Sequence, residues 1–365
     1  MTAGPKVTVL MPVHNGEPYL SAAVESVLAQ SCADFELLVI DDGSTDCSCE
    51  RVRSYADPRI RLLRNPSNLG LIATLNRGLG EAQGRYLARM DADDISLSDR
   101  LAQQVAFLDA HPEVGVLGSA IELMDAQGAP GIVVRFPASH NLIRWALAFY
   151  SPIAHPSAMM RTEIAASLGG YRSEARHCED YDLWWRATRV TALANLETVL
   201  LRVRKHDVNV TSRFGAVQHD TALRICRSIL AETLGEEFPL EVIAAAREHA
   251  RAAEALIPPA IELIVRYHRY CLGAAAALGL GEAAVMREDL TKRVYQLVNG
   301  PDRGPLDAPG QRLRSIRRYA ALACTGLLTA AETRHFRGDA AKRAWQVLKD
   351  TVRTRVLARS GASPA

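Results

Sequence analysis

Three aspartates within four residues, Asp91-Ala92-Asp93-Asp94, are the sequence feature with the clearest chemical meaning. Carboxylates this close repel one another, and clusters of this kind commonly hold a divalent cation. Mg²⁺ and Mn²⁺ suit the cluster, because these hard ions bind one or two carboxylates and take further oxygen ligands from water and phosphate groups. A cation there would neutralise charge that develops on a departing diphosphate. The alternative interpretation is a solvated acidic turn that caps the next helix.

A second set of polar residues follows two apolar runs of the sequence. His14 to Glu17 follow the run at 7–13, and Asp41-Asp42-Gly43 follow the run at 36–40. A carboxylate at such a strand end could accept hydrogen bonds from a nucleoside base or from ribose hydroxyls. The phosphate-binding patterns GxGxxG after the first run and GxxxxGK[ST] anywhere are missing, so the phosphates would need another partner. Asp42 could instead only stabilise a turn, because Asp-Gly is a common turn pair.

A third acidic segment reads RHCEDYDLWWR over residues 176–186. A group transfer in which a hydroxyl attacks needs a general base that removes the proton of that hydroxyl. Glu179 and Asp180, at the predicted start of a helix, could each supply that base. Acidic residues in the first turn also simply stabilise a helix by capping and by favourable interaction with its dipole, so both interpretations are open.

Alternating strands and helices are expected to position these acids. Short apolar runs rich in β-branched residues predict buried strands, and apolar residues three and four positions apart predict helix faces packed on a sheet. The expected strands are at 7–13, 36–40, 60–63, 86–90, 114–124, 155–160 and 199–203, and the expected helices are at 20–28, 71–82, 98–110, 141–149 and from 179 onward. This alternation predicts an α/β fold with a mostly parallel sheet and helices on both faces. Ligands bind beyond the carboxyl ends of such strands.

The remainder of the chain has a different pattern. We expect a first domain at 1–212 and an all-helical C-terminal region at 213–365, with a Pro- and Gly-rich loop at 300–310. The last part, 311–365, carries 12 Lys and Arg against 3 Asp and Glu. Its basic amphipathic helices could lie on an anionic membrane surface as a peripheral contact. We favour the alternative, in which they pack on the first domain or form a homodimer contact and keep a solvated basic face.

Composition narrows the class of protein. The 365 residues are 48% hydrophobic and 23% charged, which is typical of a globular chain with one large core and a smaller second unit. The 7 cysteines have no CxxC spacing and predict neither a disulfide framework nor a zinc site. We expect a cytoplasmic protein without signal peptide or transmembrane helix, with peripheral attachment at the inner face of the membrane as the variant. Nucleic-acid binding is disfavoured, because stacking aromatic residues are sparse in the basic tail.

Taken in order, five segments resemble glycosyltransferase family 2, whose catalytic domain has the GT-A fold. The resemblance covers about residues 6–212. Its segments are VTVLMPVHNGEPYL (7–20), SVLAQS and DFELLVIDDGSTD (26–46), NLGL to RMDADD (68–94), HPSAMMR (155–161) and EDYDLWWRA (179–187). Each motif alone is modest, whereas five in this order and spacing are specific.

The resemblance implies a role for particular residues. The implied donor-binding residues are Pro12, His14, Glu17, Asp42, Asp91 and Ala92, with the first four lining the nucleoside pocket. Asp93 would coordinate the metal ion, together with Asp91 and with His206 from the segment after the last strand. Asp180 stands where the family has its catalytic base, so we prefer it to Glu179. His14 replaces the aromatic residue that the family commonly has at that position.

The expected function follows from the resemblance. It implies a metal-dependent, inverting enzyme that moves a sugar from a nucleotide-diphosphate sugar, most readily a UDP-sugar, to an acceptor hydroxyl that could be lipid-linked. The product would be a surface polysaccharide, a glycolipid or another glycoconjugate. One alternative is a nucleotide-sugar-forming nucleotidyltransferase, but such an enzyme would need a basic, glycine-rich loop after the first strand. The other is a non-catalytic nucleotide-sugar-binding module, against which the intact Asp93 and Asp180 count.

Overall fold

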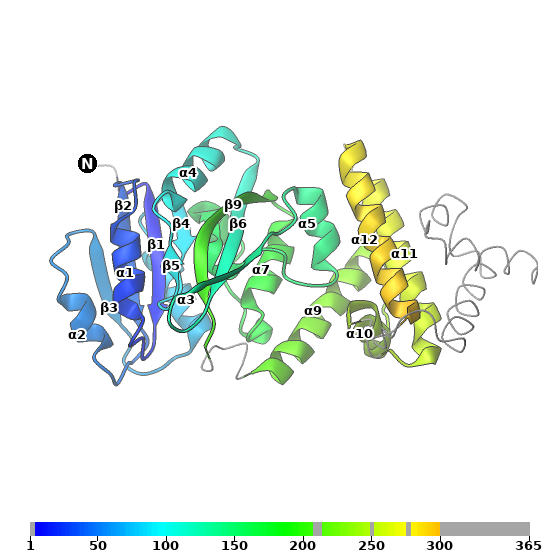
Figure 1. The fold of residues 1–365 in the computed structure, drawn as a ribbon, viewed down its shortest axis with the longest axis horizontal. Helices are drawn as coiled ribbons and strands as arrows, with labels where there is room; N and C mark the ends of the chain where they lie inside the picture. The colour runs from blue at the N-terminus through cyan, green and yellow to red at the C-terminus, as the bar shows by residue number, and fades with distance from the viewer. Residues whose placement is uncertain (1–3, 207–213, 249–251, 275–278, 300–365) are drawn as a thin grey trace, which may run out of the picture. The chain divides into compact units, whose positions relative to one another are not determined.

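A nine-stranded mixed sheet forms the centre of the first half of the chain, counted over the residues that the computed structural model describes (Figure 1). These residues are 4–206, 214–248, 252–274 and 279–299. The strand order is β3-β2-β1-β4-β8-β6-β9-β5, and β7 pairs with β6. The strands are β1 (Val7–Val13), β2 (Phe35–Asp41), β3 (Ile60–Arg64), β4 (Tyr86–Arg89), β5 (Ile95–Ser96), β6 (Val114–Met124), β7 (Pro130–Val134), β8 (Met159–Arg161) and β9 (Ala192–Arg204).

The expected α/β sheet with helices on both faces is confirmed, and its parallel part carries the motifs that follow β1, β2 and β4. Strands β3, β2, β1 and β4 are parallel, as are β6 and β9. Strand β8 runs antiparallel between β4 and β6, and the short β5 pairs antiparallel with β9. Because β2, β1 and β4 are adjacent and parallel, the segments that follow them emerge at one edge of the sheet.

The helices of this part cover both faces of the sheet. They are α1 (Leu20–Leu28), α2 (Ser48–Arg53), α3 (Leu71–Glu81), α4 (Arg100–Ala110), α5 (His140–Leu147), α6 (Thr162–Ser167) and α7 (Glu179–Ala187). Apolar residues of α1, α2 and α4 share one buried cluster with the odd-numbered residues of β1, such as Val9 and Met11. Leu10 points to the other face, where Gly78 of α3 lies against it. Alternate β1 side chains therefore contact different helix layers, as the period of a strand requires.

Two sequence expectations in the second half of the sheet need correction. The run at 155–160, expected to be extended, begins as a short 3₁₀ helix at His155–Ser157, and only Met159–Arg161 forms a strand. Pro156 explains this, because its fixed φ suits a helical turn and it has no N–H to give to a strand partner. Strand β9 also begins at Ala192, well before the expected 199.

The chain divides into two compact units, Met1–Ile225 and Cys226–Ala365. The second unit contains α10 (Leu240–Glu248), α11 (Ile257–Ala274) and α12 (Leu280–Asn299), and α9 (Gly215–Leu234) begins in the first unit and ends in the second. The helical character expected for this region is confirmed over its described residues. The loop at 300–310 and the basic helices of 311–365 lie outside the described residues. None of the described helices is long and apolar enough to cross a membrane.

Gly43 lies in a tightly packed turn directly after β2. It has φ of +70°, and a Cβ there would lie 2.5 Å from the carbonyl carbon of Ser67. We expect Gly43→Ala to lower the free energy of unfolding by about 2 kcal/mol, measured by urea denaturation. The matched control is Gly80→Ala in α3, where nothing lies within 4 Å. Alanine there should stabilise the helix by about 0.5 kcal/mol, so equal effects of the two substitutions would contradict the interpretation.

Candidate active site

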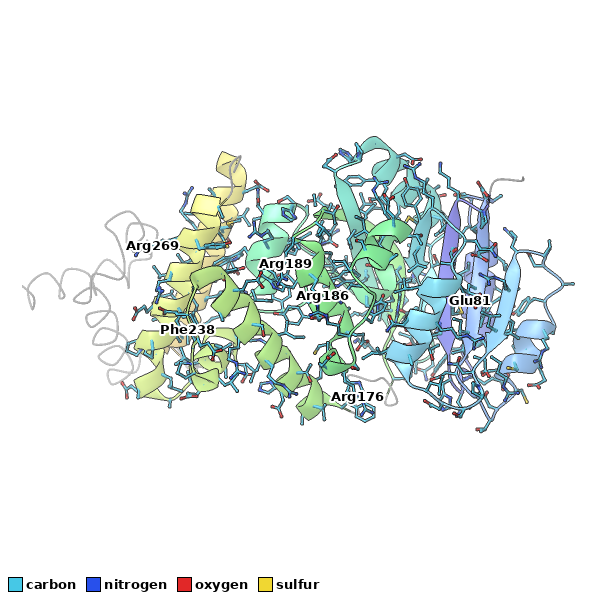
Figure 2. All side chains as sticks on the ribbon, turned by 180° about the vertical axis from the view of Figure 1, so that it is seen from behind. Glu81, Arg176, Arg186, Arg189, Phe238 and Arg269 are labelled. Carbon is cyan, nitrogen blue, oxygen red and sulfur yellow. The ribbon has the colours of Figure 1, made fainter. Side chains whose placement is uncertain are left out.

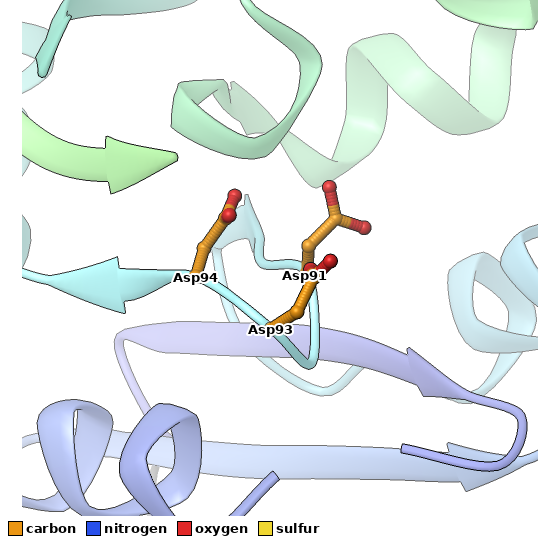
Figure 3. Close-up of side chains that lie close together, drawn as sticks. All are labelled: Asp91, Asp93 and Asp94. Carbon is orange, nitrogen blue, oxygen red and sulfur yellow. The ribbon is translucent and has the colours of Figure 1, made fainter. Parts of the chain in front are cut away.

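The three aspartates that follow β4 converge. One carboxylate oxygen each of Asp91, Asp93 and Asp94 can be chosen so that all lie within 4.8 Å of one another. Figure 3 shows the three side chains rising on the same side of the loop between β4 and β5. Asp94 is buried, whereas the side chains of Asp91 and Asp93 are 35% and 26% exposed. The cluster is therefore reachable from one side.

The electrostatics of the cluster fit a divalent cation. Burial, followed by repulsion from Asp91, raises the pKa of Asp93 and raises that of Asp94 well above its usual value. Oδ1 of Asp94 accepts the backbone N–H of Arg204 at 2.9 Å, but Oδ2 is buried without a hydrogen-bond partner among the described residues. An all-oxygen set with excess negative charge is the set that Mg²⁺ and Mn²⁺ prefer.

The end of β9 is brought directly to this cluster. Nε2 of His206 donates to Oδ2 of Asp93 at 2.8 Å, and the His206 ring stacks on Tyr19 with centroids 5.1 Å apart. Arg204 donates from Nε to the carbonyl oxygen of Asp93 at 2.9 Å, and its guanidinium lies 4.5 Å from the centre of the Tyr19 ring. His206 thus lies where it could share a cation with Asp93.

Asp42 accepts hydrogen bonds from three groups at the neighbouring edge of the sheet. Its Oδ1 accepts from the backbone N–H of Leu69 at 2.9 Å and from Nδ2 of Asn65 at 2.7 Å, and its Oδ2 accepts from the N–H of Gly70 at 2.9 Å. Nδ1 of His14 donates to the Asp42 carbonyl oxygen at 2.9 Å. These hydrogen bonds hold the carboxylate of the buried Asp42 in one orientation at the end of β2.

Glu179 and Asp180, the acidic pair, lie in the first turn of α7. Ser151 donates from Oγ to Oδ2 of Asp180 at 3.0 Å, and burial raises the pKa of Asp180. Burial, followed by repulsion from Asp180, raises the pKa of Glu179 to about 7. Arg186, labelled in Figure 2, fixes the helix by donating to Oδ2 of Asp182 at 2.8 Å and to the carbonyl oxygen of Gly170 at 2.7 Å. The pair therefore has the raised pKa values that a general base at neutral pH requires.

Comparison with known proteins identifies the family. The model of glycosyl transferase family 2 matches residues 8–143. The glycosyltransferase EpsE of Bacillus subtilis is 36% identical over 238 residues, which are 63% of this chain and 84% of EpsE. The amylovoran biosynthesis glycosyltransferase AmsE of Erwinia amylovora is 32% identical over 213 residues, which are 57% of this chain and 79% of AmsE. The chain belongs to glycosyltransferase family 2.

The fold of this family 2 glycosyltransferase is also found in a solved structure. S. aureus TarS, residues 1–349 in complex with UDP-GlcNAc, superimposes with a TM-score of 0.53 at 18% sequence identity. The superposition covers 86% of this chain and 92% of that one. The GT-A type fold expected from the sequence is confirmed.

Several of the predicted site residues contact one another in the structure. His14 contacts Asp42, and His206 contacts Asp93. Glu17 pairs through Oε1 with Arg51 of α2 at 3.1 Å, and its side chain is 33% exposed, so its predicted role in donor binding stays a prediction. The other two predicted donor-binding residues are partly buried: Pro12 lies within β1, and Ala92 packs against the hydrophobic core beneath the aspartates.

Sequence reasoning missed three residues of this site. Tyr19 lies beneath His206, Ser151 holds Asp180, and Arg89 pairs with Asp91 from inside the protein. Only Arg89 left a signal in the sequence, because it interrupts the apolar run YLARM just before the acidic cluster. An arginine inside a buried strand needs a charged partner, and the nearest acids along the chain were those aspartates.

Proposed function

We propose that this glycosyltransferase transfers a sugar with inversion from a nucleotide-diphosphate sugar to an acceptor hydroxyl, and that it depends on a divalent cation. The observation that carries the proposal is the convergence of the Asp91, Asp93 and Asp94 carboxylates within 4.8 Å. This cluster follows β4, while Asp42 and His14 follow the adjacent strands β2 and β1. A nucleoside and its diphosphate could therefore be bound along one edge of the sheet.

The residues divide into donor and acceptor roles. Asp42 would accept a hydrogen bond from the base, with His14 beside it. Asp91 and the backbone at Ala92 would contact the ribose or the diphosphate. Asp93, together with Asp91 and His206, would hold the cation, which when bound supplies positive charge to the leaving diphosphate.

The acceptor hydroxyl would attack the anomeric carbon from the side opposite the diphosphate. The new bond joins the acceptor oxygen to that carbon, and the bond from the carbon to the diphosphate oxygen breaks. Asp180 would take the acceptor proton, because it is partly exposed whereas Glu179 is buried. The raised pKa of Asp180 strengthens it as a base.

The relatives narrow the substrate class. AmsE is named for the biosynthesis of amylovoran, and TarS was solved in complex with UDP-GlcNAc. We infer that the acceptor of this chain is a growing polysaccharide or another glycoconjugate and that the donor is a UDP-sugar. The sugar itself is to be found by screening.

Calorimetry with UDP-sugars tests the proposal. We expect binding of the donor to be at least about tenfold tighter with Mn²⁺ than with EDTA, because a cation held by the aspartates would supply positive charge to the diphosphate. Equal affinity in both conditions would contradict the metal role. The anomeric configuration of the product, read from NMR coupling constants, tests inversion, and a retained configuration would overturn it. Release of pyrophosphate from a nucleoside triphosphate and a sugar phosphate would instead identify a nucleotidyltransferase.

A further inference from the structure

Arg89 is a buried cation at the end of β4, directly before the aspartate cluster. We propose that Arg89 is a positioning residue for sugar transfer: it fixes Asp91 through an ion pair and supplies a permanent positive charge to the Glu179–Asp180 pair. This inference rests on the proposed function, because it assigns the two acidic groups to donor and acceptor.

The contacts of Arg89 set it apart from a structural arginine. Its side chain is 4% exposed and forms an ion pair through Nη1 with Oδ2 of Asp91. Its Nε is buried with no hydrogen-bond partner among the described residues. Arg161, which is also buried, instead donates from Nε to the carbonyl oxygen of Val114 at 3.0 Å and from Nη2 to that of Leu108 at 2.7 Å. Arg161 holds two backbone segments together by hydrogen bonds, whereas the guanidinium of Arg89 forms an ion pair with Asp91.

The backbone at Arg89 is rigidly held. Its N–H donates to the carbonyl oxygen of Ala158 at 2.9 Å, and its own carbonyl oxygen accepts from Nη2 of Arg100 at 2.7 Å. Arg100 is itself buried and donates from Nε to Oε1 of Gln104 at 3.1 Å. A side chain that starts from such a fixed point can hold Asp91 with little loss of further entropy.

One short segment connects Arg89 to the acidic pair of α7. Ser151, at one end of the segment, donates to Asp180, and Ala158, at the other end, accepts from Arg89. Between them, Nε2 of His155 lies 2.9 Å from the hydroxyl oxygen of Tyr171, and the His155 ring lies edge-on to Trp184 of α7, with centroids 6.0 Å apart. The backbone of Arg89 is therefore linked to the start of α7 through the contacts of the segment 151–158.

The charges around the acidic pair give Arg89 its electrostatic role. Burial raises the pKa of both Glu179 and Asp180. Hydrogen bonds act against burial first, for Asp180 those from Ser151 and from the N–H of Tyr181, and the positive charge of Arg89 then lowers the pKa of both carboxyl groups further. The other groups that face the pair are Asp91, which raises the pKa of Glu179, and the Tyr171 hydroxyl, whose own pKa is raised by burial. His155 stays neutral, because burial, and then Arg89, lower its pKa well below the usual value. Arg89 is thus the charge that favours the ionised, proton-accepting form of the pair.

Arg89→Met tests the proposal in the metal-free protein. Carboxyl carbon NMR should show the pKa values of Glu179 and Asp180 rising by about one unit, because an opposite charge nearby has been removed. Arg85→Met is the control, since Arg85 is 62% exposed and pairs with Asp109 away from the site. Unchanged carboxyl pKa values in Arg89→Met would overturn the proposal, whether or not the protein transfers sugar. A shift seen in a protein without transferase activity would refute only the proposed function.

Kinetics supply the second measurement. We expect Arg89→Met to lower kcat about 100-fold and to move the acidic limb of the kcat profile to higher pH by about one unit. If the methionine variant fails to fold, Arg89→Lys replaces it. Lysine keeps the charge but not the planar fork, so the pH profile should stay in place while kcat falls at least about tenfold. A kcat equal to that of the wild type in Arg89→Lys would overturn the positioning role.

Discussion

Replacing Asp93 with alanine is expected to lower kcat for sugar transfer about 1,000-fold, because the departing diphosphate would lose its positive partner. Asp93 is the aspartate that combines partial exposure with the contact to His206 at 2.8 Å. Its carboxylate is also destabilised by burial and by Asp91, which raises its pKa and which a bound cation would relieve. The loss should appear at saturating donor and should not be restored by raising the Mn²⁺ concentration within the millimolar range.

Calorimetric titration with Mn²⁺ distinguishes the loss of a metal ligand in Asp93→Ala from a general disturbance of the fold. The Asp93→Ala protein should lose at least about 10-fold in Mn²⁺ affinity. Asp99→Ala is the matched control, because Asp99 is exposed just beyond the cluster and its side chain makes no capping hydrogen bond to α4. If Asp93→Ala bound Mn²⁺ as tightly as Asp99→Ala does, Asp93 would not be a ligand.

Asp180→Asn is expected to lower kcat by about 1,000-fold while donor affinity stays within about twofold of the wild type. Asparagine can still accept the hydrogen bond from Ser151, which lies 3.0 Å from Oδ2, so the start of α7 should keep its structure. It cannot take a proton from the acceptor. Steady-state rates together with calorimetry of the UDP-sugar separate the two properties.

Glu179→Gln distinguishes the two members of the acidic pair. Glu179 is buried and has a pKa raised to about 7, so it also titrates in the range of a general base. We expect a smaller loss from Glu179→Gln than from Asp180→Asn, and no loss from Glu174→Gln, which changes an exposed residue of the same region. A larger loss from Glu179→Gln would transfer the role of base to Glu179.

The local spacing of apolar residues was sufficient to predict the first strands and the first helix of the sheet domain. The strands at Val7–Val13 and Phe35–Asp41 and the helix at Leu20–Leu28 have the burial that their apolar spacing predicts. Hydrophobic periodicity and turn residues act between near neighbours, so a sequence carries this information directly. The acidic cluster could be predicted for the same reason, because Asp91 to Asp94 are four consecutive residues.

Only the tertiary structure decided which distant groups meet. Asp93 and His206 are 113 residues apart in the chain, and Asp42 meets the N–H groups of Leu69 and Gly70 across 27 and 28 residues. Glu17 pairs with Arg51 across 34 residues. The antiparallel β8, which supports Arg89, lies between two strands that precede it in the chain. Such contacts depend on strand order and on how helices pack, because no residue type encodes its partner across so long a separation. The sequence alone determined the type of chemistry available, and the packing of the sheet determined which charges lie together to perform it.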